Sequence, residues 1–572
     1  MKNVLIINLT RMGDLIQTTP VMAGLKDAYP DVRITLLINS AFAEICNYIP
    51  FVDRLISFNM DGFILGGRGE FPSLVSKYRY MEETLEDINS VGYDCVINFT
   101  HTKVSAAIMS LIRAKEFRGF IADNKGHSLI KHPWLRYFFN IVPGRIYNPF
   151  HLCDIYIKAG GAIPKEKGLF LEVPEDVFDS ARSELRKAGI RDSDFVIGFQ
   201  PGASDRHKMW ATDRYVELAK RLTGRLGAKV LVFGSGGERA LGEEIKKGGG
   251  CDIIDMVGKT SLKELAAFLK CCNLLISNDS GTMHVATAVG TRVIGMSLGA
   301  AYFRETGPYG KGHIVIESNA PCHPCSFHVK CQNMVCNDII SVDGVYNIIE
   351  MIYNNSRLKE IDDSPLWEGM QVYEAVFSDD GLLEYVPIIK RPMTRDILFR
   401  HLYRQMWLQT LDSYDDLPIP MNPPTPPHTN ESLYYNVGIR GDNWGIISDE
   451  MDALRRLQEL AGRALEKVRL IAEEARRENP DIEKIKDIWA DVPPIDQDID
   501  TIGFTNIALR PIVIYFKFGK ESLEGANVAV LARAACTLYK NLISQTSAMI
   551  QLLEQINKDG TLTLERGVIC QS

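Results

Sequence analysis

The strongest constraint on the fold is an alternation of apolar runs and amphipathic stretches that fills the first 350 or so residues and restarts midway. Apolar runs occur at 4–8, 34–38, 54–58 and 95–99, and again at 195–199, 229–233, 253–256, 274–277 and 292–296. Amphipathic helical patterns such as 215–226 and 262–270 lie between them. Strands that are apolar on both faces are typical of a parallel sheet covered by helices. The sequence therefore predicts an α/β chain with two Rossmann-like, doubly wound halves that face a cleft.

Length and charge narrow the possibilities. At 572 residues the chain is too long for one ordinary domain, and 64 lysines and arginines against 72 aspartates and glutamates give a net charge of −8. Such a chain is unsuited to nucleic acid as its main partner, because phosphate neutralisation requires a basic surface. Arg11 and Asp14 interrupt the first apolar run, and no run of about 18 apolar residues occurs. We therefore expect a cytoplasmic protein without a signal peptide or a membrane span.

The last third of the chain differs in character. Residues 356–445 mix strand-like and helical patterns, and they include the proline-rich segment 418–428, which predicts an extended linker. Long helical patterns begin near Ser448 and near Leu523. Residues 446–572 are therefore predicted to form a mainly helical domain. We assign its apolar stripes to packing within the domain, because no heptad pattern persists.

A turn of small residues after the strand at 274–277 is suited to binding a diphosphate. Residues 278–281 make the turn, and a helix is expected to begin at about Thr282. Backbone amides at a helix N-terminus form an anion site, and the hydroxyls of Ser280 and Thr282 and the imidazole of His284 lie beside them in sequence. The alternative is an ordinary N-cap, since Ser or Asp before a helix is common.

Two other strand exits in the second half carry candidate ligand-binding groups. The segment 199–210 brings the Ser204 hydroxyl and the Lys208 ammonium to the edge at which α/β sheets bind ligands, although a solvated charged loop is the alternative. The glycine-rich exit 232–238 ends in Glu238, whose carboxylate could accept hydrogen bonds from a ribose. That second signal is weak by itself, because glycine-rich turns are common in such folds.

In the first half, Asp14 is the candidate catalytic residue. Gly13 turns the chain after the first strand, and Asp14 stands at the start of the next helix. A carboxylate facing the cleft could act as the general base for a hydroxyl nucleophile. A helix-capping carboxylate is the alternative, and the two roles are compatible.

These motifs resemble, in order and spacing, the ADP-heptose:lipopolysaccharide heptosyltransferases of glycosyltransferase family 9. The resemblance covers roughly residues 1–350 and rests on RMGDLIQTTP, HLCDIYIKAGGAIP, PGASDRHKMW and ISNDSGTMH. It implies a GT-B fold, with an acceptor domain at 1–180 and a nucleotide-sugar domain at 181–355. It also implies inverting transfer with Asp14 as the base. The donor-binding residues that it implies are Lys208, Glu238, Asp279, Ser280, Gly281, Thr282, Met283 and His284. Ser204 is a further donor-binding candidate because of its place in the loop at 199–210.

The resemblance implies an ADP-sugar donor and a glycan, lipid-linked or protein acceptor, with no obligatory catalytic metal. Mg²⁺ bound to the donor diphosphate is a candidate cofactor. The acceptor-side candidates are Arg11, His101 and Lys103, and the acceptor is left open because segment 96–103 departs from the family pattern. Rival interpretations are a GT-B transferase with another nucleotide-sugar donor, a sugar-nucleotide epimerase, and a non-catalytic scaffold that binds nucleotide sugars.

The stretch 131–147 interleaves basic and aromatic residues and has two interpretations. A surface that meets anionic lipid or lipopolysaccharide would have this composition, which would place the protein peripherally at the inner membrane. A packed helix with charged ends would have it too.

Four of the twelve cysteines fall within one short segment, namely Cys322, Cys325, Cys331 and Cys336. This spacing is typical of a tetrathiolate site for structural zinc or iron, and His323 and His328 between them are substitute ligands. Free thiols and labile disulfides are the alternatives. We favour a metal because the chain is expected to be cytoplasmic.

Overall fold

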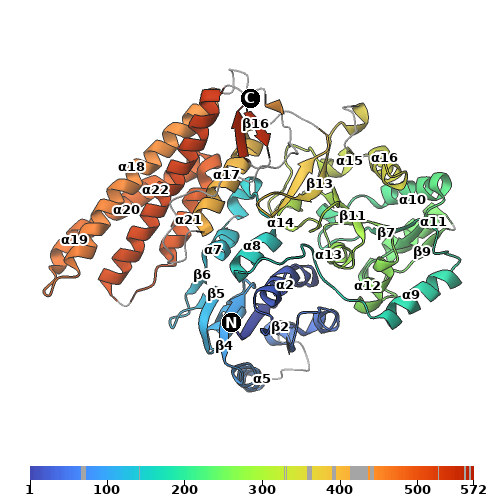
Figure 1. Ribbon diagram of the computed structural model, residues 1–572, viewed down its shortest axis with the longest axis horizontal. Coiled ribbons are helices and arrows are strands. Elements are labelled where there is room, and N and C mark those ends of the chain that lie inside the picture. The colour runs from blue at the N-terminus through green and yellow to red at the C-terminus, as the bar shows by residue number, and fades with distance from the viewer. Residues whose placement is uncertain are drawn as a thin grey trace. The chain divides into compact units, whose positions relative to one another are not determined.

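The computed structural model describes the whole chain except residues 66–72, 141, 251, 328, 330, 357, 359–363, 390–393, 413–435, 438–443, 526, 560–561, 566–567 and 572. The fold has two compact units (Figure 1). Unit 1 comprises residues 1–120 and 150–389, and unit 2 comprises residues 121–149 and 390–572. Both halves of the predicted α/β architecture therefore lie in unit 1. Residues 121–149, which the sequence analysis placed in the first half, group with the C-terminal helices.

The first half of unit 1 is a parallel sheet with the strand order β3-β2-β1-β4-β5. Its strands are β1 (Asn3–Asn8), β2 (Arg33–Asn39), β3 (Arg54–Phe58), β4 (Tyr93–Asn98) and β5 (Ala114–Ala122). Its helices are α1 (Met12–Ile16), α2 (Thr19–Ala28), α3 (Ala43–Cys46), α4 (Met60–Leu65), α5 (Leu74–Asn89), α6 (Lys103–Ser110) and α8 (Leu152–Gly160). Helices α1 and α2 follow one another closely in sequence but are separate. Pro20 lies in the first turn of α2, where the N–H that proline lacks has no partner within the helix.

The second half is an eight-stranded sheet with the order β14-β13-β12-β11-β10-β7-β8-β9. Its strands are β7 (Val196–Gln200), β8 (Lys229–Val232), β9 (Ile253–Asp255), β10 (Leu274–Asn278), β11 (Arg292–Ser297), β12 (Ile314–Ser318), β13 (Met370–Phe377) and β14 (Leu383–Pro387). The sheet is parallel from β12 to β9, and β13 and β14 add an antiparallel hairpin at its edge. The sequence predicts that this half ends at residue 355. The hairpin carries its sheet on to Pro387, and no helix alternation marks that stretch of sequence.

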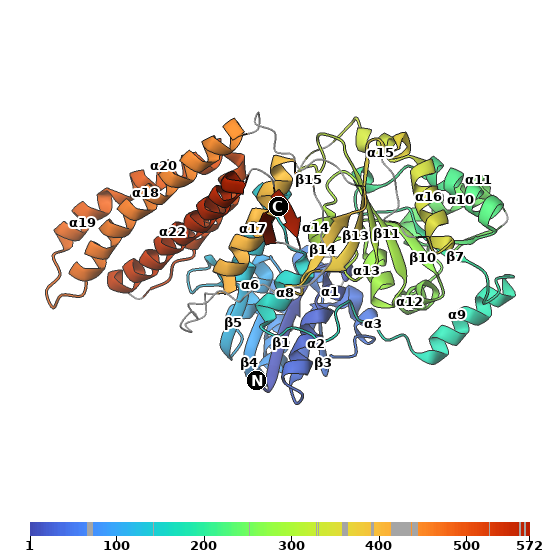
Figure 2. The same cartoon turned by 45° about the horizontal axis from the view of Figure 1, so that its top comes forward.

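Helices cover both faces of this second sheet. They are α9 (Glu175–Lys187), α10 (Thr212–Leu226), α11 (Arg239–Gly249), α12 (Leu262–Lys270), α13 (Gly281–Ala288), α14 (Phe303–Thr306), α15 (Val335–Ile339) and α16 (Val342–Tyr353). Figure 2 shows α10, α11 and α16 on one face and α12 and α13 on the other. Tyr215 of α10 and Ile348 of α16 are fully buried against Ile276 and Ile294 of the strands. This arrangement confirms the predicted doubly wound half and leaves the carboxyl ends of the strands for the loops.

Unit 2 is mainly helical, which confirms the predicted helical C-terminal region. Its helices are α7 (Pro133–Asn140), α17 (Arg395–Leu411), α18 (Trp444–Glu474), α19 (Ile482–Ala490), α20 (Val492–Thr505), α21 (Arg510–Glu521) and α22 (Val528–Asp559). The unit also includes β6 (Ser128–Lys131) and the antiparallel strands β15 (Asn436–Val437), β16 (Leu562–Glu565) and β17 (Val568–Gln571). The long helices α18 and α22 lie side by side in both views (Figures 1 and 2). The predicted proline-rich linker at 418–428 lies outside the described residues.

The basic and aromatic stretch 131–147 is packed within unit 2. The side chain of Trp134 is 1% exposed, and its indole Nε1 donates to Asp412 Oδ1 at 2.8 Å. Tyr147 donates through its hydroxyl to Asp396 Oδ1 at 2.9 Å. Aromatic rings that are buried and hydrogen-bonded in this way cannot also face lipid. Of the two interpretations, these contacts favour the packed helix, and contact of this stretch with a lipid surface stays a prediction.

Among the described helices, none is by itself both long and apolar enough to cross a membrane. One bent pair passes the same test by length and composition, formed by 482–505 and 507–521, which meet at 116°. Buried residues on these helices, including Ile499, Ile512 and Tyr515, contribute to the core of unit 2.

Candidate active site

Asp14 lies in the first turn of α1, directly after β1. Helix α1 has Arg11 as its N-cap, and the backbone N–H of Arg11 donates to the Asp14 carboxyl group, as does the side chain of Thr10. This is the capping role that the sequence allowed. Burial nevertheless raises the pKa of Asp14 above its ordinary value, and the negative charge of Asp279 adds to the rise. A carboxylate with a raised pKa is better matched to removing a proton from a hydroxyl group.

The N-terminus of α13 is the place of the predicted cradle. Ser280 is its N-cap, with an extended backbone and no side-chain capping bond, so the amides of the first turn are not occupied by the Ser280 hydroxyl. That hydroxyl lies 3.2 Å from the hydroxyl of Ser277 instead. An uncapped helix start favours the anion-site interpretation over the ordinary N-cap. Met283 and His284 are buried one turn further along α13.

Lys208 and Asp279 join the loop at 199–210 to the turn at 278–281. The Lys208 ammonium donates to Asp279 Oδ2 at 2.7 Å, and the two side chains are only 15% and 18% exposed. The short helix at Arg206–Lys208, capped by Asp205, positions this lysine at the exit of β7. One cation, one carboxylate and a helix N-terminus therefore converge on one point of the carboxyl edge.

Helix α1 of the first half packs directly on α13 of the second. A Cβ atom added to Gly13 would lie 2.8 Å from the His284 ring and 3.4 Å from Gly281 Cα, and one added to Gly281 would lie 2.7 Å from Met12 Cε. Only glycine at both positions allows the two helices to approach this closely. The approach explains how the charge of Asp279 reaches Asp14.

The remaining donor-side candidates lie around this point in different ways. Ser204 is exposed in the loop after β7. Thr282 is 8% exposed, and its hydroxyl donates to Gln200 Oε1 at 2.9 Å, so it fixes the loop from within. Glu238 accepts from Ser235 N at 2.6 Å and from Ser235 Oγ at 2.9 Å. A Cβ at Gly202 would overlap the Glu238 carboxylate, which places Glu238 against the loop after β7.

The acceptor-side candidates lie at the exits of the neighbouring strands β1 and β4. Arg11, His101 and Lys103 are all exposed there. Thr100 accepts from Leu9 N through its hydroxyl at 2.8 Å, which joins the two exits. The structure therefore groups these three side chains on one edge of the first sheet, and their role stays a prediction.

The HLCD segment ties the two halves of unit 1 together. His151 Nε2 lies 3.0 Å from Gly307 O, and Asp154 accepts from the Tyr309 hydroxyl at 2.7 Å and from Leu383 N at 2.9 Å. Asp154 and His151 are almost fully buried. Buried carboxylates are stable only when they are paired or hydrogen-bonded, so these contacts fix how α8 meets the second half.

The four clustered cysteines lie beside the Lys208 loop. His207 Nε2 lies 2.7 Å from Cys331 O, and Cys325 N donates to Gly299 O at 2.8 Å. Burial raises the pKa of Cys325, and the thiols of the other three cysteines raise it further. Within the described ranges, however, no three Cys, His, Asp or Glu side chains are arranged to hold a metal ion. All four cysteines are free thiols in the structure, which therefore gives the metal prediction no support.

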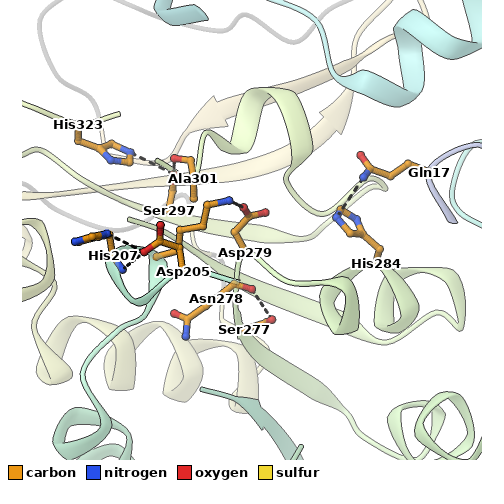
Figure 3. Close-up of polar contacts among 11 residues, drawn as sticks. Gln17, Asp205, His207, Ser277, Asn278, Asp279, His284, Ser297, Ala301 and His323 are labelled. Atoms are coloured by element: carbon orange, nitrogen blue, oxygen red, sulfur yellow. Dashed lines mark hydrogen bonds and ion pairs between the residues drawn. The ribbon is translucent and has the colours of Figure 1, made fainter. Parts of the chain in front are cut away.

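Three polar residues of the site were missed in the sequence. Asn278 donates through Nδ2 to Pro201 O at 2.7 Å and accepts from Trp210 N at 3.0 Å, so it joins the exits of β10 and β7. Gln200 holds Thr282, and Gln17 reaches His284 across the contact between the halves (Figure 3). Asn278 and Gln200 end apolar strands. A polar residue at the end of such a strand is the sequence signal that could have identified them. Gln17 has no such signal, because its partner is distant in sequence.

Part of this chain is similar to known glycosyltransferases. Residues 83–335 match the model of glycosyltransferase family 9 (heptosyltransferase). Lipopolysaccharide heptosyltransferase 3 of Escherichia coli K12 is 27% identical over 298 residues, which cover 50% of this chain and 79% of that protein. Lipooligosaccharide heptosyltransferase 2 of Haemophilus influenzae is 26% identical over 302 residues, covering 51% and 82%.

A solved structure of a family 9 glycosyltransferase from Veillonella parvula has a TM-score of 0.52 and 26% identity, and the match covers 62% of this chain and 98% of that one. The fold of unit 1 is GT-B, and the C-terminal helical region lies beyond the matched domain. The chain therefore carries a glycosyltransferase family 9 (heptosyltransferase) domain and is a glycosyltransferase.

Proposed function

We propose that the chain transfers a heptose from an ADP-activated donor to a hydroxyl of a cell-surface glycan such as the lipopolysaccharide core, with inversion at the anomeric carbon. One observation supports this most. The fold packs the helix that carries Asp14 onto α13, whose N-terminus lies beside the ion pair of Lys208 and Asp279. A candidate base and a candidate diphosphate cradle thus face one reaction site from the two halves. The names of the relatives support the sugar and the class of acceptor.

In this scheme the Asp14 carboxylate takes the proton of the acceptor hydroxyl. The acceptor oxygen forms its bond to the anomeric carbon while the bond from that carbon to the diphosphate oxygen breaks on the opposite face. ADP departs with the electron pair of the broken bond, and the sugar inverts. Lys208 and the α13 amides meet the negative charge that develops on the diphosphate. Preorganised donors of this kind usually supply the largest catalytic term.

A donor panel tests the proposal. The full-length protein is incubated with ADP-heptose, UDP-GlcNAc and GDP-mannose, with and without EDTA, and binding and nucleotide release are measured for each. We expect ADP-heptose to bind and turn over in preference to the other two donors, and turnover to persist in EDTA. Preference for another nucleotide would reassign the donor, and tight binding without turnover on any acceptor would favour the scaffold interpretation. Conversion of the sugar nucleotide without nucleotide release would identify an epimerase.

Metal binding by Cys322, Cys325, Cys331 and Cys336 stays a prediction, with a structural role beside the Lys208 loop. Elemental analysis after anaerobic purification is expected to find about one equivalent of zinc or iron per chain. The matched control is a variant with serine at Cys325 and Cys331, which should lose that metal. An untreated protein with about a tenth of an equivalent or less would contradict the prediction.

A further inference from the structure

Gln17 connects the helix of the candidate base to the helix of the cradle. It ends α1 as the C-cap, is 1% exposed, and donates through Nε2 to Gly13 O at 3.3 Å. The same nitrogen lies 3.4 Å from His284 Nε2 on α13, and the two side chains face one another (Figure 3). The contact with His284 crosses from α1 to α13. The contact with Gly13 lies where Gly13 and Gly281 let these two helices touch.

These two contacts determine the orientation of the amide group and the tautomer of the histidine. A carbonyl oxygen only accepts, so the atom of Gln17 next to Gly13 O must be its NH₂ group. The opposite orientation would place two acceptor oxygens against each other. The second hydrogen of the same NH₂ group faces His284 Nε2, which must therefore accept it. The ring proton of a neutral His284 is then on Nδ1.

The contact between Gln17 and His284 costs folding stability. Gln17 Oε1 and His284 Nδ1 are both buried, and neither has a hydrogen-bond partner in the described part of the chain. A buried polar atom without a partner costs about 1–3 kcal/mol, so two apolar side chains of similar size would make a more stable contact. Burial also lowers the pKa of His284 to about 4, so the ring is neutral near pH 7. A costly polar contact at a reaction site points to function.

We propose that Gln17 is a positioning residue for glycosyl transfer, which ties the Asp14 helix to the cradle helix and holds His284 as the Nδ1–H tautomer. The role rests on the proposed function, since it takes Asp14 as the base and α13 as the donor cradle. Gln17 touches neither reactant in this scheme. It sets the distance between the base that acts on the acceptor hydroxyl and the cradle that holds the leaving diphosphate, and a misplacement of about 1 Å at such a site can cost about 10²-fold in rate.

The test compares Gln17→Met with Gln371→Met in the full-length protein. Gln371 is a matched control, because it is also buried in unit 1 and donates through Nε2 to Ile389 O at 2.7 Å, away from the α1–α13 contact. The His284 tautomer is read from long-range ¹H–¹⁵N spectra of protein labelled on the histidine rings, with the signal assigned by a His284→Asn variant. Calorimetry gives the affinity for ADP, and nucleotide release from ADP-heptose gives kcat and KM.

We expect wild type and Gln371→Met to show the Nδ1–H tautomer of His284, and Gln17→Met to lose it. Gln17→Met should lower kcat by about tenfold or more, with the ADP affinity within about threefold of wild type. Gln17→Leu is the second variant, used if Gln17→Met fails to fold. Leucine also lacks a donor for His284 Nε2, so this variant should lose the Nδ1–H tautomer too.

An unchanged tautomer in the Gln17 variants, or a kcat equal to that of Gln371→Met, would overturn the positioning role, because that role requires both changes. If the wild type releases no nucleotide from ADP-heptose, the proposed function fails instead. The tautomer measurement is independent of turnover and would still show whether Gln17 fixes His284.

Discussion

Asp14→Asn is expected to lower glycosyl transfer by about 10²–10⁴-fold, the range that a positioned general base contributes. Asparagine has nearly the size of aspartate but cannot take a proton from the acceptor hydroxyl. Its amide oxygen can still accept from the Arg11 backbone N–H, so α1 should remain capped. The affinity for ADP should stay within about threefold of wild type, because the base acts on the acceptor and not on the diphosphate. Turnover with saturating donor and calorimetry with ADP measure the two quantities.

Asp94→Asn is the matched control. Asp94 is also a hydrogen-bonded aspartate of the first half, but it lies on β4 and pairs with Lys115 at 2.7 Å, outside the candidate site. It should keep wild-type turnover. Full turnover by Asp14→Asn would remove Asp14 from the role of base and leave it only the capping role.

The same residue predicts a pH dependence of kcat for the wild type. The base works only as a carboxylate, so turnover should fall as the pH drops through the pKa of Asp14. Burial and the charge of Asp279 raise that pKa, so this acid limb should lie above the ordinary value of 3.8. A rate that stays constant down to that value would show that no group with a raised pKa is needed.

Much of the fold could be predicted because parallel strands buried on both faces leave continuous apolar runs in the sequence. The prediction placed β3 at its observed bounds and α12 likewise. The hairpin of β13 and β14 was not predicted, because antiparallel edge strands lack that signature and this hairpin is far in sequence from β12, with which β13 pairs. The grouping of residues 121–149 with unit 2 was not predicted for a similar reason, since the hydrogen-bond partners of Trp134 and Tyr147 come 278 and 249 residues later.

The candidate site, like the fold, has parts that the sequence could predict and parts that it could not. Each loop could be predicted because a strand exit followed by small and charged residues is a local pattern, as at Asp279 and Lys208. The contacts that join the loops could not be predicted, because they depend on packing between segments that are distant in sequence. The Gly13–Gly281 approach, the Gln17–His284 contact and the pairing of Lys208 with Asp279 are all of this kind.

Lys208→Met is expected to weaken ADP binding by about 10–100-fold, which corresponds to the roughly 1.5–3 kcal/mol of a hydrogen bond to a charged group. Turnover at saturating donor should also fall, by about 10²–10³-fold, because the lysine meets charge that grows as the diphosphate departs. Methionine keeps most of the aliphatic stem, so the loop at 206–208 should retain its packing. Lys208→Arg should recover part of both losses, since it restores the positive charge.

Lys229→Met is the matched control for this prediction. Lys229 also forms a partly buried ion pair in the second half, with Asp252, but it begins β8 and so lies at the opposite edge of the sheet from the cradle. It should keep wild-type ADP affinity and turnover.

The Lys208 variant has one further consequence that the control lacks. Removing the ammonium leaves Asp279 without its ion-pair partner while its charge still acts on Asp14, so the acid limb of kcat should move to higher pH. Equal ADP affinities for Lys208→Met and Lys229→Met would contradict the role of Lys208 at the diphosphate. An unmoved acid limb would show that Asp279 and Asp14 do not act on one another during the reaction.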